Sequence, residues 1–190
     1  MPQPAKKGLH QKFTWQDYLT WPEDERWEVI DGDAYNMIPS PTERHQRVVV
    51  NITVQLKEKL KDSPCRVYIA PLDVYLDDHN FVQPDVLVVC DKNKIKDRIY
   101  GAPDLIIEVL SFFTAIKDRR LKKDLYERFG VREYVIVHLE EQYIERFFLK
   151  DGRYSEPDIL GPEEVFISSS LDGVEMPLWE VFEIEKPESE

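Results

Sequence analysis

The hydrophobic positions change their period several times along the chain, and each change predicts a new element. A cap pattern at Thr14 and Asp17 predicts a short helix to about residue 21. Two apolar runs around Asp31-Gly32 predict a β-hairpin over 27–38, because Asp-Gly favours a two-residue turn. Helical spacing then predicts two long helices, over 42–62 and over 114–129.

Short apolar runs predict the strands of a mixed sheet, over 66–70, 72–76, 82–90, 104–110, 133–139 and 143–149. The polar segment 91–100 predicts a surface loop, and the remainder predicts short strands and turns. We therefore expect the α/β (α+β) class, a mixed central sheet flanked by helices with added β-hairpins. No repeat or linker divides the chain, so we expect one domain over 1–190, with a core of about 13–150 and an acidic extension over 151–190.

Length and composition narrow the class of protein. The 190 residues suffice for one domain with a sizeable core. No apolar run reaches the roughly 18 residues of a membrane span, and the first residues lack a signal-peptide core. Cys65 and Cys90 lack metal-ligand spacing and are interpreted as reduced core thiols. These features predict a cytoplasmic protein with no membrane partner.

The negative charge is concentrated near the C-terminus. Of the net charge of −12, residues 140–190 supply 15 acids and 4 bases, which leaves 22 acids and 21 bases in residues 1–139. A strongly basic chain would indicate nucleic-acid binding, and this chain is not basic. Residues 1–139, which are nearly neutral, could still present a local basic face.

Carboxylates inside apolar runs are the first chemical signal. Asp85 opens an apolar run, and Glu108 follows three apolar residues of the next run. A buried charge is costly unless it is paired or bound to a metal. Neighbouring strands lie about 4.8 Å apart, so these two carboxylates could converge on one Mg²⁺ or Mn²⁺ ion. Lys122 shares a helical face with Leu125 and Tyr126 and is predicted to point inward, and Glu28 lies mid-strand.

Each of these residues also has a structural interpretation. An acid at a strand end often caps a loop or pairs with a lysine, which is the role predicted for Asp104 after Pro103. Asp73 fits either interpretation. His45 lies on the apolar stripe of the first long helix, which is typical of a core histidine.

Six segments in order resemble one family: WEVIDGDAYNM (27–37), SPTERHQRVVVNI (40–52), VYIAPLDVYLDD (67–78), VQPDVLVVCD (82–91), GAPDLIIEVLS (101–111) and KDRRLKKDLYERFGVREYVIV (117–137). Together they resemble the Uma-two-type family of endonucleases, which have the restriction-endonuclease-like PD-(D/E)xK fold. The resemblance covers about residues 13–150. It implies that Asp85 and Glu108 bind the divalent metal.

The resemblance also assigns the remaining site residues. The usual lysine two positions after the second acid is replaced by Leu110, and the resemblance implies that Lys122 takes its place. It implies that Glu28 is an additional ligand or a water-orienting carboxylate. It implies that His45 lies beside the metal or the phosphate. Gln83, which precedes Pro84, either sets the entry of the strand or is a secondary binding candidate.

The chain departs from the family pattern in two places. Phe112 and Phe113 stand where the family has Pro-Ser, and His138-Leu139 replace an acid and a proline. Phe112 and Phe113 could shape a substrate edge or a homodimer interface. The C-terminal pair Trp179/Phe182 could do the latter as well, or pack in the core.

The leading hypothesis is a Mg²⁺-dependent (or Mn²⁺-dependent) endonuclease that hydrolyses phosphodiester bonds of DNA. Two basic runs could contact phosphates or form solvated faces: Lys92, Lys94, Lys96 and Arg98, and Lys117, Arg119, Arg120 and Lys123.

The alternative is a non-catalytic accessory module that binds nucleic acid or protein and retains the fold. Hydrolysis of another phosphoester is a third hypothesis, because a fold does not dictate a substrate. A homodimer is expected only by analogy with nucleases that cut two strands.

Overall fold

The computed structural model describes residues 11–37, 40–110 and 115–188, without the side chains of 115–119. Its helical elements are α1 (Trp15–Tyr18), α2 (Glu43–Lys59), the 3₁₀ turn η1 (Lys92–Lys94), α3 (Ala115–Phe129) and α4 (Leu178–Phe182). Its strands are β1 (Trp27–Ile30), β2 (Asp33–Asn36), β3 (Arg66–Ile69), β4 (Val74–Asp77), β5 (Asn80–Val82), β6 (Val86–Val89), β7 (Ile99–Tyr100), β8 (Leu105–Leu110), β9 (Glu133–His138), β10 (Tyr143–Lys150), β11 (Arg153–Tyr154), β12 (Asp158–Leu160), β13 (Val165–Ser168) and β14 (Val174–Pro177).

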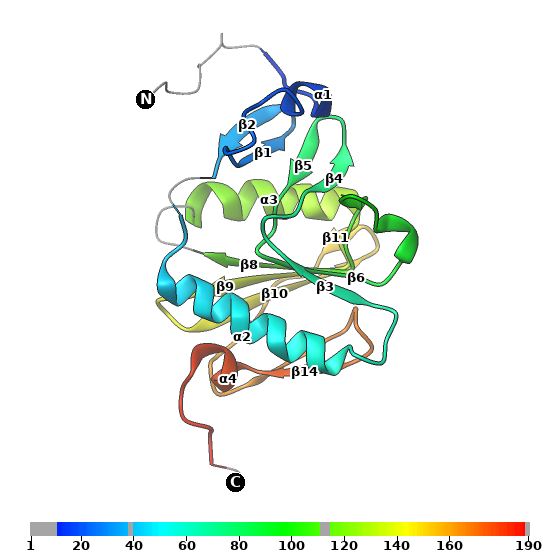
Figure 1. Ribbon diagram of the computed structural model, residues 1–190. Coiled ribbons are helices and arrows are strands. Elements are labelled where there is room, and N and C mark those ends of the chain that lie inside the picture. Colours follow the sequence, from blue (N-terminus) through cyan, green and yellow to red (C-terminus); the bar gives the residue numbers. More distant parts are fainter. Residues whose placement is uncertain (1–10, 38–39, 111–114, 189–190) are drawn as a thin grey trace.

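The main sheet has the strand order β11-β10-β9-β8-β6-β3, with β12 also paired to β10. All neighbouring strands of this sheet are antiparallel except β8 and β9, which run parallel and are joined through α3. Figure 1 shows α3 on one face of this sheet and α2 with α4 on the other. The element order and the mixed sheet agree with the class predicted from the sequence.

Alternation along the strands of the main sheet separates two cores. Val86, Ile107 and Val135 pack toward α2 and α4, whereas Leu87 and Ile106 pack toward α3. Successive side chains of a strand point to opposite faces. Glu108 therefore has the same orientation as Ile106, toward α3.

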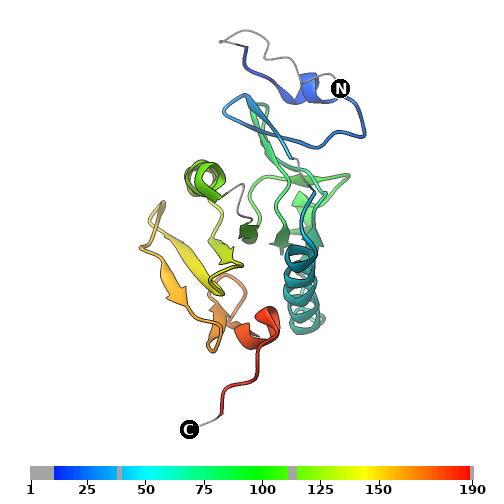
Figure 2. The same ribbon diagram turned by 90° about the vertical axis from the view of Figure 1, so that its left-hand side faces the viewer.

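A smaller sheet of order β2-β1-β5-β4-β7 lies at the N-terminal end of the molecule (Figures 1 and 2). The predicted hairpin is confirmed, with Asp31 and Gly32 both at positive φ, 51° and 78°. The predicted cap is also confirmed, because the Thr14 hydroxyl and the Asp17 carboxylate form a reciprocal capping box. Trp15 packs edge-on against Phe81 and joins α1 to the small sheet.

The C-terminal quarter is part of the core rather than a tail. The ribbon of β13 and β14 and the helix α4 contribute buried apolar residues to the α2 face of the main sheet: Phe166, Leu171, Met176, Leu178, Val181 and Phe182. Phe182 therefore packs in the core, one of its two predicted fates. Phe112 and Phe113, the other candidate interface, lie outside the described residues.

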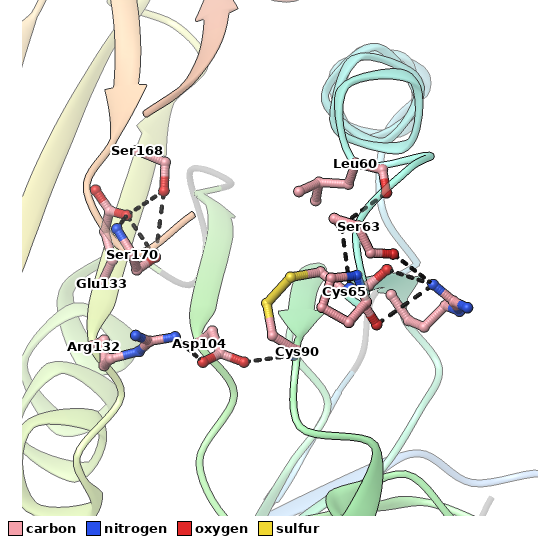
Figure 3. The surroundings of a disulfide bond; sticks show 11 residues. Leu60, Ser63, Cys65, Cys90, Asp104, Arg132, Glu133, Ser168 and Ser170 are labelled. Atoms are coloured by element: carbon pink, nitrogen blue, oxygen red, sulfur yellow. Dashed lines mark hydrogen bonds and ion pairs between the residues drawn. A yellow bond between two sulfur atoms is a disulfide. The ribbon is translucent and has the colours of Figure 1, made fainter. Parts of the chain in front are cut away.

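The prediction of reduced thiols is wrong, because Cys65 and Cys90 form a disulfide (Figure 3). Arg66 pairs with Val89 in the antiparallel β3–β6 ladder, so the two cysteines lie directly opposite each other one residue beyond it. Spacing in sequence does not show this, since only the strand register brings them together. Disulfides are rare in cytosolic proteins, so the thiol argument for a cytoplasmic location is lost. Among the described residues, no helix is long and apolar enough to cross a membrane.

Candidate active site

Asp85 and Glu108 lie side by side where the two sheets meet. The segment Gln83–Asp85 links β5 of the small sheet to β6 of the main sheet. The β6–β8 register pairs Val86 with Ile107, which sets Asp85 opposite Glu108. The backbone N–H of Val109 donates to Asp85 Oδ2 at 2.8 Å and fixes that carboxylate against β8.

Lys122 joins two buried glutamates from different sheets. Its Nζ lies 2.8 Å from Glu28 Oε1 on β1 and 3.0 Å from Glu108 Oε1 on β8. All three residues are buried, with Lys122 only 3% exposed. The structure thus brings together the lysine and both glutamates that the sequence predicted, while Lys123 lies over the Phe147 ring at 4.4 Å.

Tyr126 is a member of this cluster that the sequence analysis did not nominate. Its hydroxyl donates to Glu108 Oε1 at 2.8 Å and is fully buried. Burial raises the pKa of Tyr126 well above its ordinary value, so the hydroxyl remains a donor. Its position four residues after Lys122, on the same helical face, was the available signal.

Burial makes Glu108 an unusually weak acid. Loss of hydration raises the pKa of the Glu108 carboxyl, Lys122 lowers it, and the neighbouring Asp85 and Glu28 raise it, with a net pKa of about 8. A carboxyl group in this state is neutral or ionised depending on small changes near neutral pH. Such a perturbed group is typical of functional sites.

Each of the three carboxylates is held through one oxygen. Asp85 Oδ2 accepts from the Val109 N–H. Glu108 Oε1 accepts from Lys122 and Tyr126. Glu28 Oε1 contacts Lys122 and accepts from the Gln83 backbone N–H at 2.9 Å. No donor among the described residues contacts the second oxygen of any of the three. The site therefore combines fixed carboxylates with uncommitted oxygen atoms.

His45 contacts the site from the opposite face of the main sheet. It lies in the first turn of α2, and its Nε2 is 3.2 Å from Asp85 Oδ2. The ring is buried, and its Nδ1 has no hydrogen-bond partner among the described residues. Thus His45 is both on the buried stripe and in contact with a predicted site residue.

Gln83 supports the site through its backbone and through its side chain. Besides the bond from its N–H to Glu28, its Nε2 donates to Asp73 Oδ1 at 2.9 Å and its Oε1 accepts from Arg26 Nε at 3.1 Å. Asp73 also accepts from the Tyr18 hydroxyl at 3.4 Å. The ambiguous Asp73 therefore anchors Gln83.

Two other candidates have structural contacts. Asp104 accepts from the Cys90 N–H and pairs with Arg132, which agrees with the turn-capping role predicted for it (Figure 3). In the 92–98 loop, Lys94 donates to the Ala102 carbonyl and Arg98 lies over the Trp15 ring. These contacts favour the structural interpretation of that basic run.

The donor set fits a hard divalent cation. Asp85, directly before β6, and Glu108 on β8 offer oxygen ligands side by side, which suits Mg²⁺ or Mn²⁺. Among the described residues, no three His, Cys, Asp or Glu side chains converge as a metal site. Further ligands would therefore be backbone oxygens and water. The third acid of the cluster, Glu28, already contacts Lys122 through Oε1.

Comparison with known proteins identifies the class. Residues 15–178 match the Uma2 family, described as "Putative restriction endonuclease". The match spans most of the chain, so this protein belongs to the Uma2 family. The family resemblance inferred from the sequence is confirmed.

A solved structure supports the same fold. A crystal structure described as that of a "putative nuclease belonging to DUF820" from Anabaena variabilis is 19% identical, with a TM-score of 0.75. The alignment covers 90% of this chain and 98% of that one. The predicted restriction-endonuclease-like fold class is confirmed, and no curated protein matches the chain. Family and fold together support a nuclease.

Proposed function

We propose that the protein is a divalent-metal-dependent endonuclease that hydrolyses phosphodiester bonds of DNA. One observation carries the proposal: Lys122 lies 3.0 Å from Glu108, which is opposite Asp85 at the start of the neighbouring strand β6. This arrangement gives the acid, acid and lysine set of the PD-(D/E)xK pattern, although the lysine comes from α3. A divalent cation at such a site lowers the pKa of bound water and neutralises phosphate charge.

The residues of the site would bind the metal, orient the attacking water, or support the residues that do so. Asp85 and Glu108 would bind Mg²⁺ or Mn²⁺ through their uncommitted oxygens, together with the Val109 carbonyl. Lys122 would orient the attacking water and donate hydrogen bonds to the developing negative charge. Glu28 and Gln83 would keep Lys122 in position, with Glu28 as a further ligand candidate. His45 would fix Asp85 through Nε2.

Calorimetric titration with Mn²⁺ tests the metal site without any assumption about substrate. We expect wild type to bind Mn²⁺, and Asp85→Asn and Glu108→Gln to lose at least about tenfold in affinity. Glu23→Gln, an exposed residue outside the site, is the matched control and should bind like wild type. Equal binding by wild type and Asp85→Asn would contradict the assignment of Asp85.

A cleavage assay on plasmid DNA with Mn²⁺ tests the activity. Asp85→Asn and Lys122→Met should abolish cleavage, and Lys122→Met should still bind Mn²⁺. Cleavage retained by Asp85→Asn would overturn the nuclease assignment at this site.

The charge distribution favours a second candidate, a non-catalytic module that retained the nuclease fold. The net charge is −12, and the Lys94 and Arg98 side chains of the candidate phosphate loop are held by contacts within the chain. Mn²⁺ binding without cleavage of single- or double-stranded DNA would favour this candidate. Loss of cleavage in both site variants would exclude it.

A further inference from the structure

Arg26 lies next to the site and has not been assigned a role so far. Its Nε donates to Gln83 Oε1 at 3.1 Å, and the N–H of the same Gln83 donates to Glu28 at 2.9 Å. Gln83 also lies two positions before Asp85. Gln83 therefore contacts Arg26 through its side chain and Glu28 through its backbone N–H.

The orientation of the Gln83 amide is unambiguous. Its Nε2 faces Asp73, which can only accept when ionised, and its Oε1 faces Arg26, which can only donate. Asp73 thus fixes the amide, and the amide oxygen holds Nε of Arg26. The half-buried Arg26 is held before any ligand arrives.

Arg26 differs from most described arginines in the charge of its partner. Carboxylates neutralise seven others, in the pairs Arg44–Glu140, Arg47–Glu183, Arg98–Asp97, Arg128–Asp31, Arg132–Asp104, Arg146–Asp158 and Arg153–Glu127. Arg26 is bound by a neutral amide, and its two terminal nitrogens contact no acceptor among the described residues. A guanidinium with both terminal groups available suits two-point binding of a phosphate.

The site also needs a cation for its substrate. Glu28 and Glu108 share one lysine, and Asp85 adds a third carboxyl group opposite Glu108, in a chain of net charge −12. A negatively charged phosphodiester approaching these acids is repelled unless positive charge lies near its path.

We propose that Arg26 binds a backbone phosphate of the nucleic acid next to the scissile bond. This inference rests on the proposed nuclease function and adds the residue that holds the substrate. Contact with a phosphate rather than a base implies that it does not depend on sequence.

The test is fluorescence anisotropy of a short fluorescein-labelled DNA duplex with full-length protein and Ca²⁺, the probe being checked for integrity on a gel. Arg26→Gln should bind about 3- to 10-fold more weakly for every duplex sequence, and the slope of log K against log salt should fall by about one. Arg26→Lys, which keeps the charge without the planar fork, should give an intermediate affinity. Arg153→Gln, on an exposed arginine, makes the same charge change and should leave both quantities unchanged.

The outcomes separate this inference from the proposed function. If Arg26→Gln has the affinity and the salt slope of wild type, the phosphate role is overturned while the metal site and cleavage stand. If wild type binds Mn²⁺ but no DNA, the phosphate role and the choice of DNA both fail. A weakened Arg26→Gln with wild-type Mn²⁺ affinity and melting temperature supports the role, because a purely structural arginine would alter melting and leave the salt slope unchanged.

Discussion

Glu108 and Glu133 are both buried glutamates, on the adjacent parallel strands β8 and β9, yet their surroundings differ. Glu133 is fully buried and both of its oxygens accept hydrogen bonds. Its donors, visible in part in Figure 3, are Ser168 Oγ at 2.5 Å, Ser170 Oγ at 2.8 Å, Ser170 N at 3.1 Å and Ser169 N at 3.3 Å. Glu108 receives its two donors, Lys122 and Tyr126, on one oxygen alone.

The two glutamates differ in how many of their oxygens accept hydrogen bonds, and this difference distinguishes a buried carboxylate that stabilises the fold from one that serves a site. A carboxylate that is saturated by donors stabilises the fold, and here Glu133 ties the start of β9 to the segment after β13. A largely buried carboxylate with an uncommitted oxygen keeps a capacity for a cation or a proton. Burial by itself therefore does not mark a site, and these two glutamates differ in how fully their oxygens are satisfied.

The largest expected effect is on the stability of the Glu133 cluster. Glu133→Ala would leave two buried hydroxyls and the buried Ser170 N–H without their acceptor, so we expect a loss of about 3–5 kcal/mol in the free energy of unfolding. Glu108→Gln should change it by less than about 1 kcal/mol below the ordinary Glu pKa of 4.5, because the wild-type carboxyl is then protonated in both the folded and the unfolded state and the amide resembles it. Chemical denaturation measures both.

Equal losses for the two variants would break the comparison. That result would mean that Glu108 is held as tightly as Glu133, and that its second oxygen contributes nothing special. Mn²⁺ affinity provides the complementary readout, since Glu133→Gln should leave it unchanged if the protein folds.

The pH dependence of stability sharpens the comparison. The pKa of Glu108 rises from 4.5 to about 8 on folding, so between these values the folded state binds a proton that the unfolded state has released. Stability should therefore fall as pH increases through this window, by on the order of 1 kcal/mol per pH unit. Glu108→Gln should remove that slope in metal-free protein. A wild-type unfolding free energy that rises with pH across the window, unchanged by the substitution, would refute the assignment.

A smaller effect is expected from removal of one donor to Glu108. Tyr126→Phe deletes the hydroxyl that donates at 2.8 Å and leaves the ring packed against Tyr134. The lost hydrogen bond should raise the pKa of Glu108 further and weaken Mn²⁺ binding by about tenfold, as for other residues that orient metal ligands. Calorimetry at two pH values measures it, and the loss should shrink at the higher pH. A loss independent of pH would point to altered packing instead.

Much of the fold could be predicted because its signals are local. The Thr14 cap, the Asp31-Gly32 turn and the stripe of α2 all depend on neighbouring residues, and each matches the structure. The inward face of α3 followed from helical spacing, which selected Lys122 over Lys123.

The remainder depends on contacts between distant segments. The Cys65–Cys90 bond follows from the register of two strands, and α4 has only five residues and no side-chain cap, so it leaves no helical period. Its burial arises from packing against α2. The supporting contacts of the site, such as Arg26 with Gln83 and His45 with Asp85, join residues at least 40 positions apart.

The smallest expected effect comes from the lysine next to the site. Lys122 and Lys123 are adjacent in sequence, but Lys122 lies between two buried carboxylates and Lys123 lies over the Phe147 ring. Lys123→Met keeps an apolar stem on that ring, so we expect less than about twofold change in Mn²⁺ affinity and in cleavage, and at most about 0.5 kcal/mol in stability. Lys122→Met, with the same loss of charge, should abolish cleavage. If both variants lost cleavage equally, the cause would be the weaker positive charge over α3. The specific contact of Lys122 with Glu108 would then not be the reason.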